Sequence, residues 1–310
     1  MRVLFWGTPD FAIPPLRALA GEGFEVVGVV TQPDKPVGRH RTKLEPPPVK
    51  LVALEESIPV LQPDRPRGDE FLGELRSLEP DISVVVAYGH ILPTNVIDLP
   101  KLGTVNIHAS LLPMLRGAAP IQAAIREGHA ETGVTIMRMV KALDAGPMLL
   151  QVRTPIPDDE TYGELQLRLA EMGALALIEA LALIDIGEAA ERPQDESRAT
   201  YAPKVDRPMT RVEWTADAIT VSRIVRAYDP RPGAHAMATT GEVKLFGARL
   251  APDARQGEPG EVLAIDDDGM TIACGSGAVR ISTVHPAGKR RLSPRQWASG
   301  RGIAVGERLS

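Results

Sequence analysis

Short apolar segments that alternate with helical segments constrain the fold of this 310-residue chain more than any other feature. Buried strands are predicted at residues 3–6, 25–31, 59–62 and 81–87. Their nearly unbroken apolar runs are typical of a parallel sheet that is covered on both faces. Helices are predicted between them, near residues 13–20 and 69–78. This alternation favours an α/β fold with a Rossmann-like, doubly wound, mostly parallel sheet.

The chain opens with a strand, a turn at Gly7 and a helix, as a dinucleotide-binding unit does. No further glycine occurs before Gly21, however, so the G-x-G-x-x-G fingerprint is absent. This absence disfavours a nicotinamide cofactor.

The length of the chain favours two domains. A capping box, Thr161-x-x-Glu164, predicts a helix through about Ile184. A polar, proline-marked linker follows, then a helix at 216–227 and short strands near 243–250, 260–264, 270–273 and 278–284. We therefore predict a first domain at 1–190, a linker at 191–207 and a small OB-like C-terminal β-barrel at 208–310.

The strongest candidate site is the stretch Thr104–Gly117, where a predicted strand ends in polar residues. Successive side chains of a strand point to opposite faces, so Asn106 and His108 share one face. Pro113 then excludes a continuing central strand. Ligands bind at the carboxyl edge of open α/β sheets, which favours a site here. The alternative is a strand end whose polar groups only satisfy nearby backbone.

Two further loops bear on this site. The strand at 81–87 ends in Tyr88-Gly-His-Ile-Leu-Pro93, and two strand ends side by side would form a crevice. His90 either lines this crevice or, as is more common for a lone histidine, makes a surface hydrogen bond. A predicted strand at 133–139 leads into the loop 140–147, which carries Asp144. Asp beside Gly and Pro is most often a plain turn former. Asp144 therefore belongs to the site only if its loop folds over the end of the His108 strand.

Composition limits the compartment and the partners. A single cysteine, Cys274, excludes an internal disulfide and a multi-cysteine metal site, as expected in a reducing cytosol. No apolar run approaches the roughly 18 residues of a membrane span, and the short apolar N-terminus breaks at Gly7, so no signal peptide is expected. The net charge is −5, although residues 208–310 carry 14 Lys and Arg against 11 Asp and Glu. The proline-bracketed loop 32–50 is basic; a phosphate-facing role and an idle surface loop remain equal alternatives.

The chain resembles the methionyl-tRNA formyltransferases, a branch of the 10-formyltetrahydrofolate-dependent formyltransferases. Asn106-Ile-His108 and the distant Leu143-Asp144-x-Gly146 mark the broader class. The methionyl-tRNA branch is indicated by Gly7-Thr-Pro-Asp-Phe-Ala12 and Arg116-Gly-Ala-Ala-Pro-Ile-Gln122. The segments Ser110-Leu-Leu-Pro113 and Thr132-Gly-Val-Thr135 add to the overall resemblance. One departure is Leu115, where family members commonly carry an aromatic residue.

The resemblance implies formyl transfer from 10-formyltetrahydrofolate to the α-amino group of methionine on initiator tRNA, for translation initiation, without a metal. It implies a catalytic set of Asn106, His108 and Asp144. In this set Asp144 either orients His108 and stabilises its imidazolium or takes the proton through water. It places the folate against Val86, Ala87, Tyr88, Gly89, Ile91, Leu92, Ser110, Leu111, Leu112 and Pro113, and Arg116 with Ser110 at the reacting end. It implies tRNA contacts at Arg39, Arg41 and Lys43 in the basic loop and at Lys289, Arg290 and Arg291 in the barrel. A cytoplasmic monomer is expected.

Two other functions remain open from the sequence. A formyltransferase for a small amine, such as an amino sugar or glycinamide ribotide, would keep the same three catalytic residues but has no need of a basic barrel. A non-enzymatic tRNA- or nucleotide-binding module would not need imidazole and carboxylate to converge. The separation of His108 and Asp144 discriminates between the enzymatic and non-enzymatic alternatives.

Overall fold

The computed structural model describes residues 1–37 and 43–310, so Arg39 and Arg41 lie outside the described residues. The chain divides into two compact units. Unit 1 comprises residues 1–117, 132–154 and 166–201, and unit 2 comprises 118–131, 155–165 and 202–310. The domain boundaries predicted from the sequence, at 190 and 208, stay predictions.

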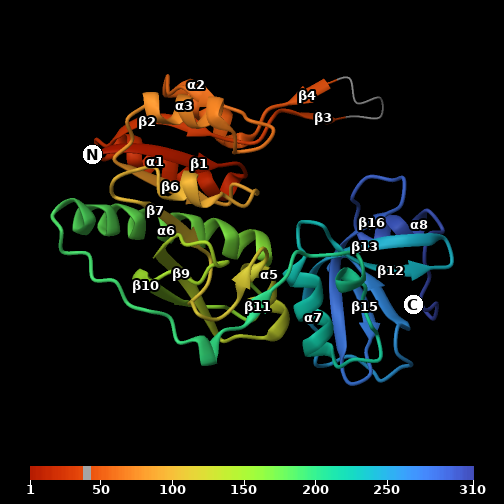
Figure 1. Cartoon of the computed structure of the whole chain (residues 1–310). Coiled ribbons are helices and arrows are strands. Elements are labelled where there is room, and N and C mark those ends of the chain that lie inside the picture. Colours follow the sequence, from red (N-terminus) through yellow and green to blue (C-terminus); the bar gives the residue numbers. More distant parts are fainter. Residues whose placement is uncertain (38–42) are drawn as a thin grey trace. The chain divides into compact units, whose positions relative to one another are not determined.

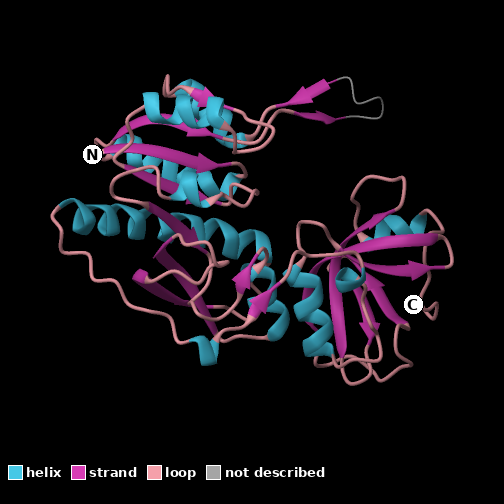
Figure 2. Ribbon diagram, in the orientation of Figure 1, coloured by secondary structure: helices cyan, strands magenta, loops and turns pink. Residues whose placement is uncertain are grey.

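A seven-stranded sheet forms the centre of unit 1 (Figures 1 and 2). Its strands lie in the order β10-β9-β7-β6-β1-β2-β5. They are β1 (Arg2–Gly7), β2 (Glu25–Val30), β5 (Val60–Leu61), β6 (Ile82–Val86), β7 (Thr104–His108), β9 (Glu131–Arg138) and β10 (Met148–Pro155). The run from β5 to β7 is parallel, and β9 pairs antiparallel with β7. The predicted Rossmann-like, mostly parallel sheet is confirmed.

Helices pack on both faces of this sheet. They are α1 (Ile13–Gly21), α2 (Pro48–Glu55), α3 (Asp69–Ser77), α4 (Thr94–Ile97) and α6 (Tyr162–Asp185). Val85 of β6 packs with residues of α3 and α4 on one face. Gly173 of α6 lies against Ile107 of β7, where an added Cβ would be 3.0 Å from the Ile107 side chain. Ile107 points away from the Asn106 face, so α6 covers the opposite side.

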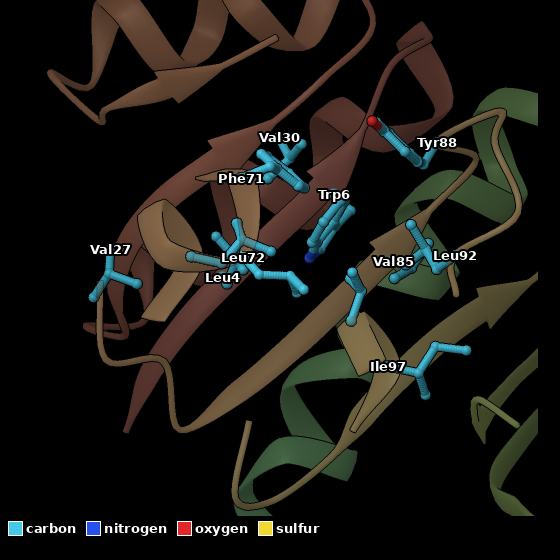
Figure 3. Close-up of a cluster of buried hydrophobic side chains, with 12 residues drawn as sticks. Leu4, Trp6, Val27, Val30, Phe71, Leu72, Val85, Tyr88, Leu92 and Ile97 are labelled. Atoms are coloured by element: carbon cyan, nitrogen blue, oxygen red, sulfur yellow. The ribbon is translucent and has the colours of Figure 1, made fainter. Parts of the chain in front are cut away.

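The core on the α3 face is built around Trp6 (Figure 3). Its ring meets the rings of Phe71 and Tyr88 edge-on, with centroids 6.1 and 5.3 Å apart. The Trp6 indole N–H donates to the hydroxyl of Ser83 over 3.2 Å, which satisfies the buried donor. This packing fixes the ends of β1 and β6, and therefore the edge at which the site lies.

Several predicted elements are confirmed, and some were missed. The capping box is present: the Thr161 N–H donates to Glu164 over 2.9 Å, the Glu164 N–H donates to the Thr161 hydroxyl over 3.3 Å, and α6 begins at Tyr162. The loop expected at 32–50 is instead partly regular. It contains the antiparallel strands β3 (Lys35–Val37) and β4 (Lys43–Glu45), and α2 begins at Pro48. Its prolines misled the prediction, because Pro36 lies in a two-stranded edge and Pro48 begins a helix, two positions where proline is tolerated.

Unit 2 contains a five-stranded antiparallel sheet in the order β12-β13-β16-β15-β14. The strands are β12 (Ala234–Ala238), β13 (Gly241–Leu250), β14 (Val262–Asp266), β15 (Gly269–Ala273) and β16 (Ala278–Pro286), with helices α5 (Pro120–Glu127), α7 (Ala218–Ala227) and α8 (Pro294–Ser299). The final residues bind both edge strands: Ser310 exchanges backbone hydrogen bonds with Met237, and the Val262 N–H donates to Glu307. The last segment thus bridges the sheet edges as in a small barrel.

Candidate active site

His108 ends β7 and is held by a backbone carbonyl. Its side chain is buried, and Nε2 lies 2.9 Å from the carbonyl oxygen of Leu115. A carbonyl only accepts, so Nε2 carries the proton of this hydrogen bond. The other ring nitrogen, Nδ1, is therefore the one that can exchange a proton with a reactant.

Asp144 lies beside that second nitrogen. The loop after β9 folds over the end of β7, and Oδ2 of Asp144 is 3.7 Å from Nδ1 of His108. The same oxygen accepts the backbone N–H of Gly117 over 2.8 Å. The condition that the sequence set for Asp144 is met, since the carboxylate faces the imidazole. Leu115, however, provides the direct hydrogen bond to the ring, so an orienting role for Asp144 stays a prediction.

Asn106 lies two residues before His108, on the same face of β7. Its register partner on β6 is Val85, and its side-chain Nδ2 donates to the carbonyl of Val85 over 3.0 Å. A carboxamide nitrogen carries two N–H groups. One of them fixes the side chain, and the second can donate to a bound oxygen.

Hydrogen bonds within the loop and from residues of β9 and β10 hold the loop after β7 in place. The Ser110 hydroxyl donates to the Met114 carbonyl over 2.6 Å, and the Thr135 hydroxyl donates to the Ser110 carbonyl over 2.7 Å. Gln151 Nε2 donates to the Leu112 carbonyl over 2.9 Å. The predicted folate contact through Ser110 therefore involves a hydroxyl that already has a protein acceptor. Sequence reasoning missed Gln151, because it lies on β10, a strand that was not among those predicted from apolar patterning.

The loop after β6 presents unpaired backbone donors. Among the described residues, the N–H groups of 87–92 have no hydrogen-bond partner. Ala87 and Gly89 have positive φ values of 49° and 93°, and Ile91 is 87% exposed, whereas Val86, Tyr88 and Leu92 are buried. The Tyr88 carbonyl accepts from Thr8 Oγ1 (2.9 Å) and Gln32 Nε2 (3.2 Å), which fixes the loop. These donors suit a ligand rich in acceptor atoms.

The Tyr88 side chain of this loop is buried. Burial raises the pKa of its hydroxyl to about 12. The group stays neutral near pH 7, and the Tyr88 ring packs edge-on against the ring of Trp6.

Arg116 is buried and fully engaged within unit 1. Its side chain is 2% exposed, and the guanidinium donates to Gln194 Oε1 through Nε (3.0 Å) and Nη2 (2.7 Å). It also forms a two-point ion pair with Glu196, with distances of 2.9 and 2.7 Å. The hydrogen bonds to Glu196 raise the pKa of the guanidinium. Arg116, which was predicted at the reacting end, is thus already hydrogen-bonded to Gln194 and ion-paired with Glu196.

The basic residues predicted for tRNA contact differ in whether their side chains already contact other parts of the protein. Lys43, Lys289, Arg290 and Arg291 are all exposed. Arg291, however, stacks 3.8 Å above the Phe246 ring and donates to the Pro230 carbonyl over 2.7 Å, so it also has a structural role. Sequence could not reveal this, since Phe246 is 45 positions away.

Within residues 1–37 and 43–310, no group of three His, Cys, Asp or Glu side chains has the arrangement of a metal site. No helix in this part of the chain is long and apolar enough to cross a membrane. Cys274 is buried, and burial raises the pKa of its thiol to about 11, so the thiol is a packing group.

Two family models match this chain. A formyl transferase family model matches residues 1–181, and a model of the formyl transferase C-terminal domain matches 204–302. The methionyl-tRNA formyltransferase of Aromatoleum aromaticum is 47% identical over 309 residues, covering 100% of this chain and 97% of that protein. That of Pseudomonas putida strain F1 is 47% identical over 293 residues, 94% of each chain.

Solved structures share the fold. HypX from Aquifex aeolicus in complex with tetrahydrofolic acid has a TM-score of 0.70 and 24% identity, over 99% of this chain and 48% of that chain. A methionyl-tRNA formyltransferase from Clostridium thermocellum has a TM-score of 0.58 and 11% identity, over 82% of this chain and 95% of that one.

Proposed function

Since the chain belongs to the methionyl-tRNA formyltransferase family, we propose that it transfers a formyl group from 10-formyltetrahydrofolate to the α-amino group of methionyl initiator tRNA. The observation that carries the proposal is the approach of Asp144 Oδ2 to His108 Nδ1, at 3.7 Å, at the strand end that also carries Asn106. The enzyme would act in the cytoplasm as a monomer.

Asn106 and His108 supply the groups that acyl transfer requires. The neutral amine of methionine attacks the formyl carbon, and a tetrahedral oxyanion forms. The second N–H of Asn106 stabilises that oxygen without changing its own charge. His108 Nδ1 accepts the proton that the attacking nitrogen loses, and the Asp144 carboxylate stabilises the resulting imidazolium. The proton then passes to N10, and the C–N10 bond breaks to release tetrahydrofolate.

The folate contacts are proposed at two loops that follow the neighbouring strands β6 and β7. The unpaired N–H groups of residues 87–92 fit the acceptor atoms of a pterin ring. Leu111, Leu112 and Pro113 supply apolar surface from the second loop. Both loops leave the carboxyl edge of the sheet, where open α/β folds bind ligands.

The tRNA would contact the basic segments of both units. Lys43 lies on β4, next to the residues outside the described range, and Lys289 and Arg290 follow β16. Such cations meet phosphates without reading sequence. This binding would be largely independent of base identity and weaker at high salt.

One assay tests the proposal. The enzyme is incubated with 10-formyltetrahydrofolate and charged initiator tRNA, and formylmethionine is scored. Parallel reactions offer free methionine, a nucleotide-linked amino sugar and glycinamide ribotide. Formylation of the tRNA alone supports the proposal. Formylation of a small amine in preference to the tRNA would favour the alternative formyltransferase, and no turnover with any acceptor would indicate a binding module.

A further inference from the structure

Gln194 holds the backbone of the loop that carries Asp144. Its Nε2 donates to the carbonyl of Asp144 over 2.7 Å and to that of Gly146 over 2.8 Å, so both N–H groups of this amide bind one loop. Asp144 has a φ of +48°, a conformation that costs energy in a residue with a side chain. Such a conformation persists only where surrounding contacts determine it, and Gln194 provides two of them.

The other end of the same amide binds Arg116. Oε1 of Gln194 accepts two hydrogen bonds from the guanidinium, and Arg116 directly precedes Gly117, whose N–H binds the Asp144 carboxylate. Gln194 therefore closes a ring of contacts that runs through Arg116, Gly117 and Asp144. The ring fixes the Asp144 backbone and its carboxylate at the same time.

Thr200, six residues after Gln194, hydrogen-bonds to the segment that holds His108. Its hydroxyl accepts the N–H of Leu115 over 2.9 Å, and its carbonyl accepts the N–H of Arg116 over 2.9 Å. The carbonyl of Leu115 is the group that holds His108. Residues 194–200 have the composition of a linker. They nevertheless hydrogen-bond to the segments that hold His108 and Asp144 in place.

We propose that Gln194 is a positioning residue for formyl transfer, which acts by holding Asp144 against His108; this inference rests on the proposed function. Gln194 touches neither substrate in this role. Its loss lets the Asp144 loop relax from its strained backbone, and the carboxylate moves away from Nδ1. Misplacement by about 1 Å costs roughly a hundredfold in rate in other enzymes.

The substitution Gln194→Glu separates the two ends of the amide. A carboxylate keeps acceptors for Arg116 but has no N–H for the carbonyls of Asp144 and Gly146. We expect the single-turnover formylation rate at saturating substrates to fall by about a hundredfold, with unchanged KM for folate and tRNA. Gln194→Met removes the donors without adding charge and also removes the acceptor for Arg116. It should give the same loss of rate if Gln194→Glu fails to fold. Gln256→Glu is the matched control, because it adds the same charge at an exposed glutamine of unit 2.

A double-mutant cycle with Asp144→Asn tests whether the effect passes through Asp144. If it does, adding Gln194→Glu to Asp144→Asn slows the reaction little further. Effects that multiply in the double variant, or a parental rate in both Gln194 variants, would overturn the inference while leaving the proposed function intact. A parent enzyme that fails to formylate charged tRNA would instead overturn the proposed function, and the inference with it.

Discussion

Gly117 and Asp144 are joined by a hydrogen bond of 2.8 Å, in which the Gly117 backbone N–H donates to Oδ2 of the carboxylate. Gly117 has a φ of +114°, which residues with a side chain rarely adopt, so a glycine is needed for this N–H to point at Asp144. The same oxygen faces His108 Nδ1. Gly117, in the short strand β8 (Arg116–Gly117), therefore sets the place of the carboxylate in the site.

The first prediction concerns the charge of Asp144. Asp144→Asn keeps an oxygen that accepts the Gly117 N–H, so the side chain stays in place while the negative charge is lost. Because the imidazolium of His108 is then unsupported, we expect single-turnover formylation to slow by about a hundredfold or more, with both substrates still bound.

Rapid-quench measurement at saturating folate and charged tRNA checks this outcome. A plain turn-forming Asp predicts a rate within a few-fold of the parent, because Asn forms the same turns. A rate of that size would remove Asp144 from the mechanism.

The second prediction concerns Gln151, which supports the loop after β7. Its Nε2 donates to the Leu112 carbonyl and, over 3.0 Å, to the Thr135 hydroxyl. Gln151→Met removes both bonds at similar volume, so the loop loses its support beside the proposed folate site. We expect the KM for folate to rise about fivefold, as for the loss of about 1 kcal/mol, with an unchanged KM for tRNA. A lower maximal rate with an unchanged KM for folate would indicate general unfolding instead and would contradict this role of Gln151.

The fold and the side chains of the candidate site can be predicted from local sequence patterns. The residues that hold those side chains in place cannot. The apolar runs at β1, β2 and β6 and the period-2 face of Asn106 and His108 are local properties, so they are readable from the sequence. The ring through Gln194 and Arg116 joins positions 78 residues apart, and only packing brings them together. The residues 191–207 look like linker for the same reason: their polar side chains bind distant partners that composition does not show.

The third prediction concerns pH and Asp229 in unit 2. Burial raises the pKa of this carboxyl, and its Oδ2 accepts the Gly247 N–H over 2.8 Å. A raised folded-state pKa means that the native state holds the proton more tightly than the unfolded state does. Stability from this group is therefore present below the unfolded value of 3.8 and is lost as pH rises toward the folded value.

Asp229→Asn should remove that loss, because Asn keeps an acceptor for Gly247 and carries no charge. We expect the free energy of unfolding of the variant, relative to the parent, to increase from pH 3.5 upward and then level off, as measured by urea denaturation at a series of about six pH values. A difference that is constant with pH would contradict the assignment.

The last prediction separates RNA contact from packing in the run 289–291. Lys289 and Arg290 are exposed after β16, whereas Arg291 stacks on Phe246 and binds the Pro230 carbonyl. Replacing Lys289 and Arg290 by Ala should weaken tRNA binding and lower the slope of log Kd against log salt by about 0.7–0.9 for each phosphate that is no longer neutralised, with unchanged thermal stability.

Arg291→Ala is the comparison within the same run. It should lower the melting temperature, because it removes a cation–π interaction of about 0.5–1 kcal/mol and a hydrogen bond. Filter binding at several salt concentrations, with melting curves of each variant, measures both effects. Parental affinity and salt slope in the double variant would exclude these two cations from the tRNA surface.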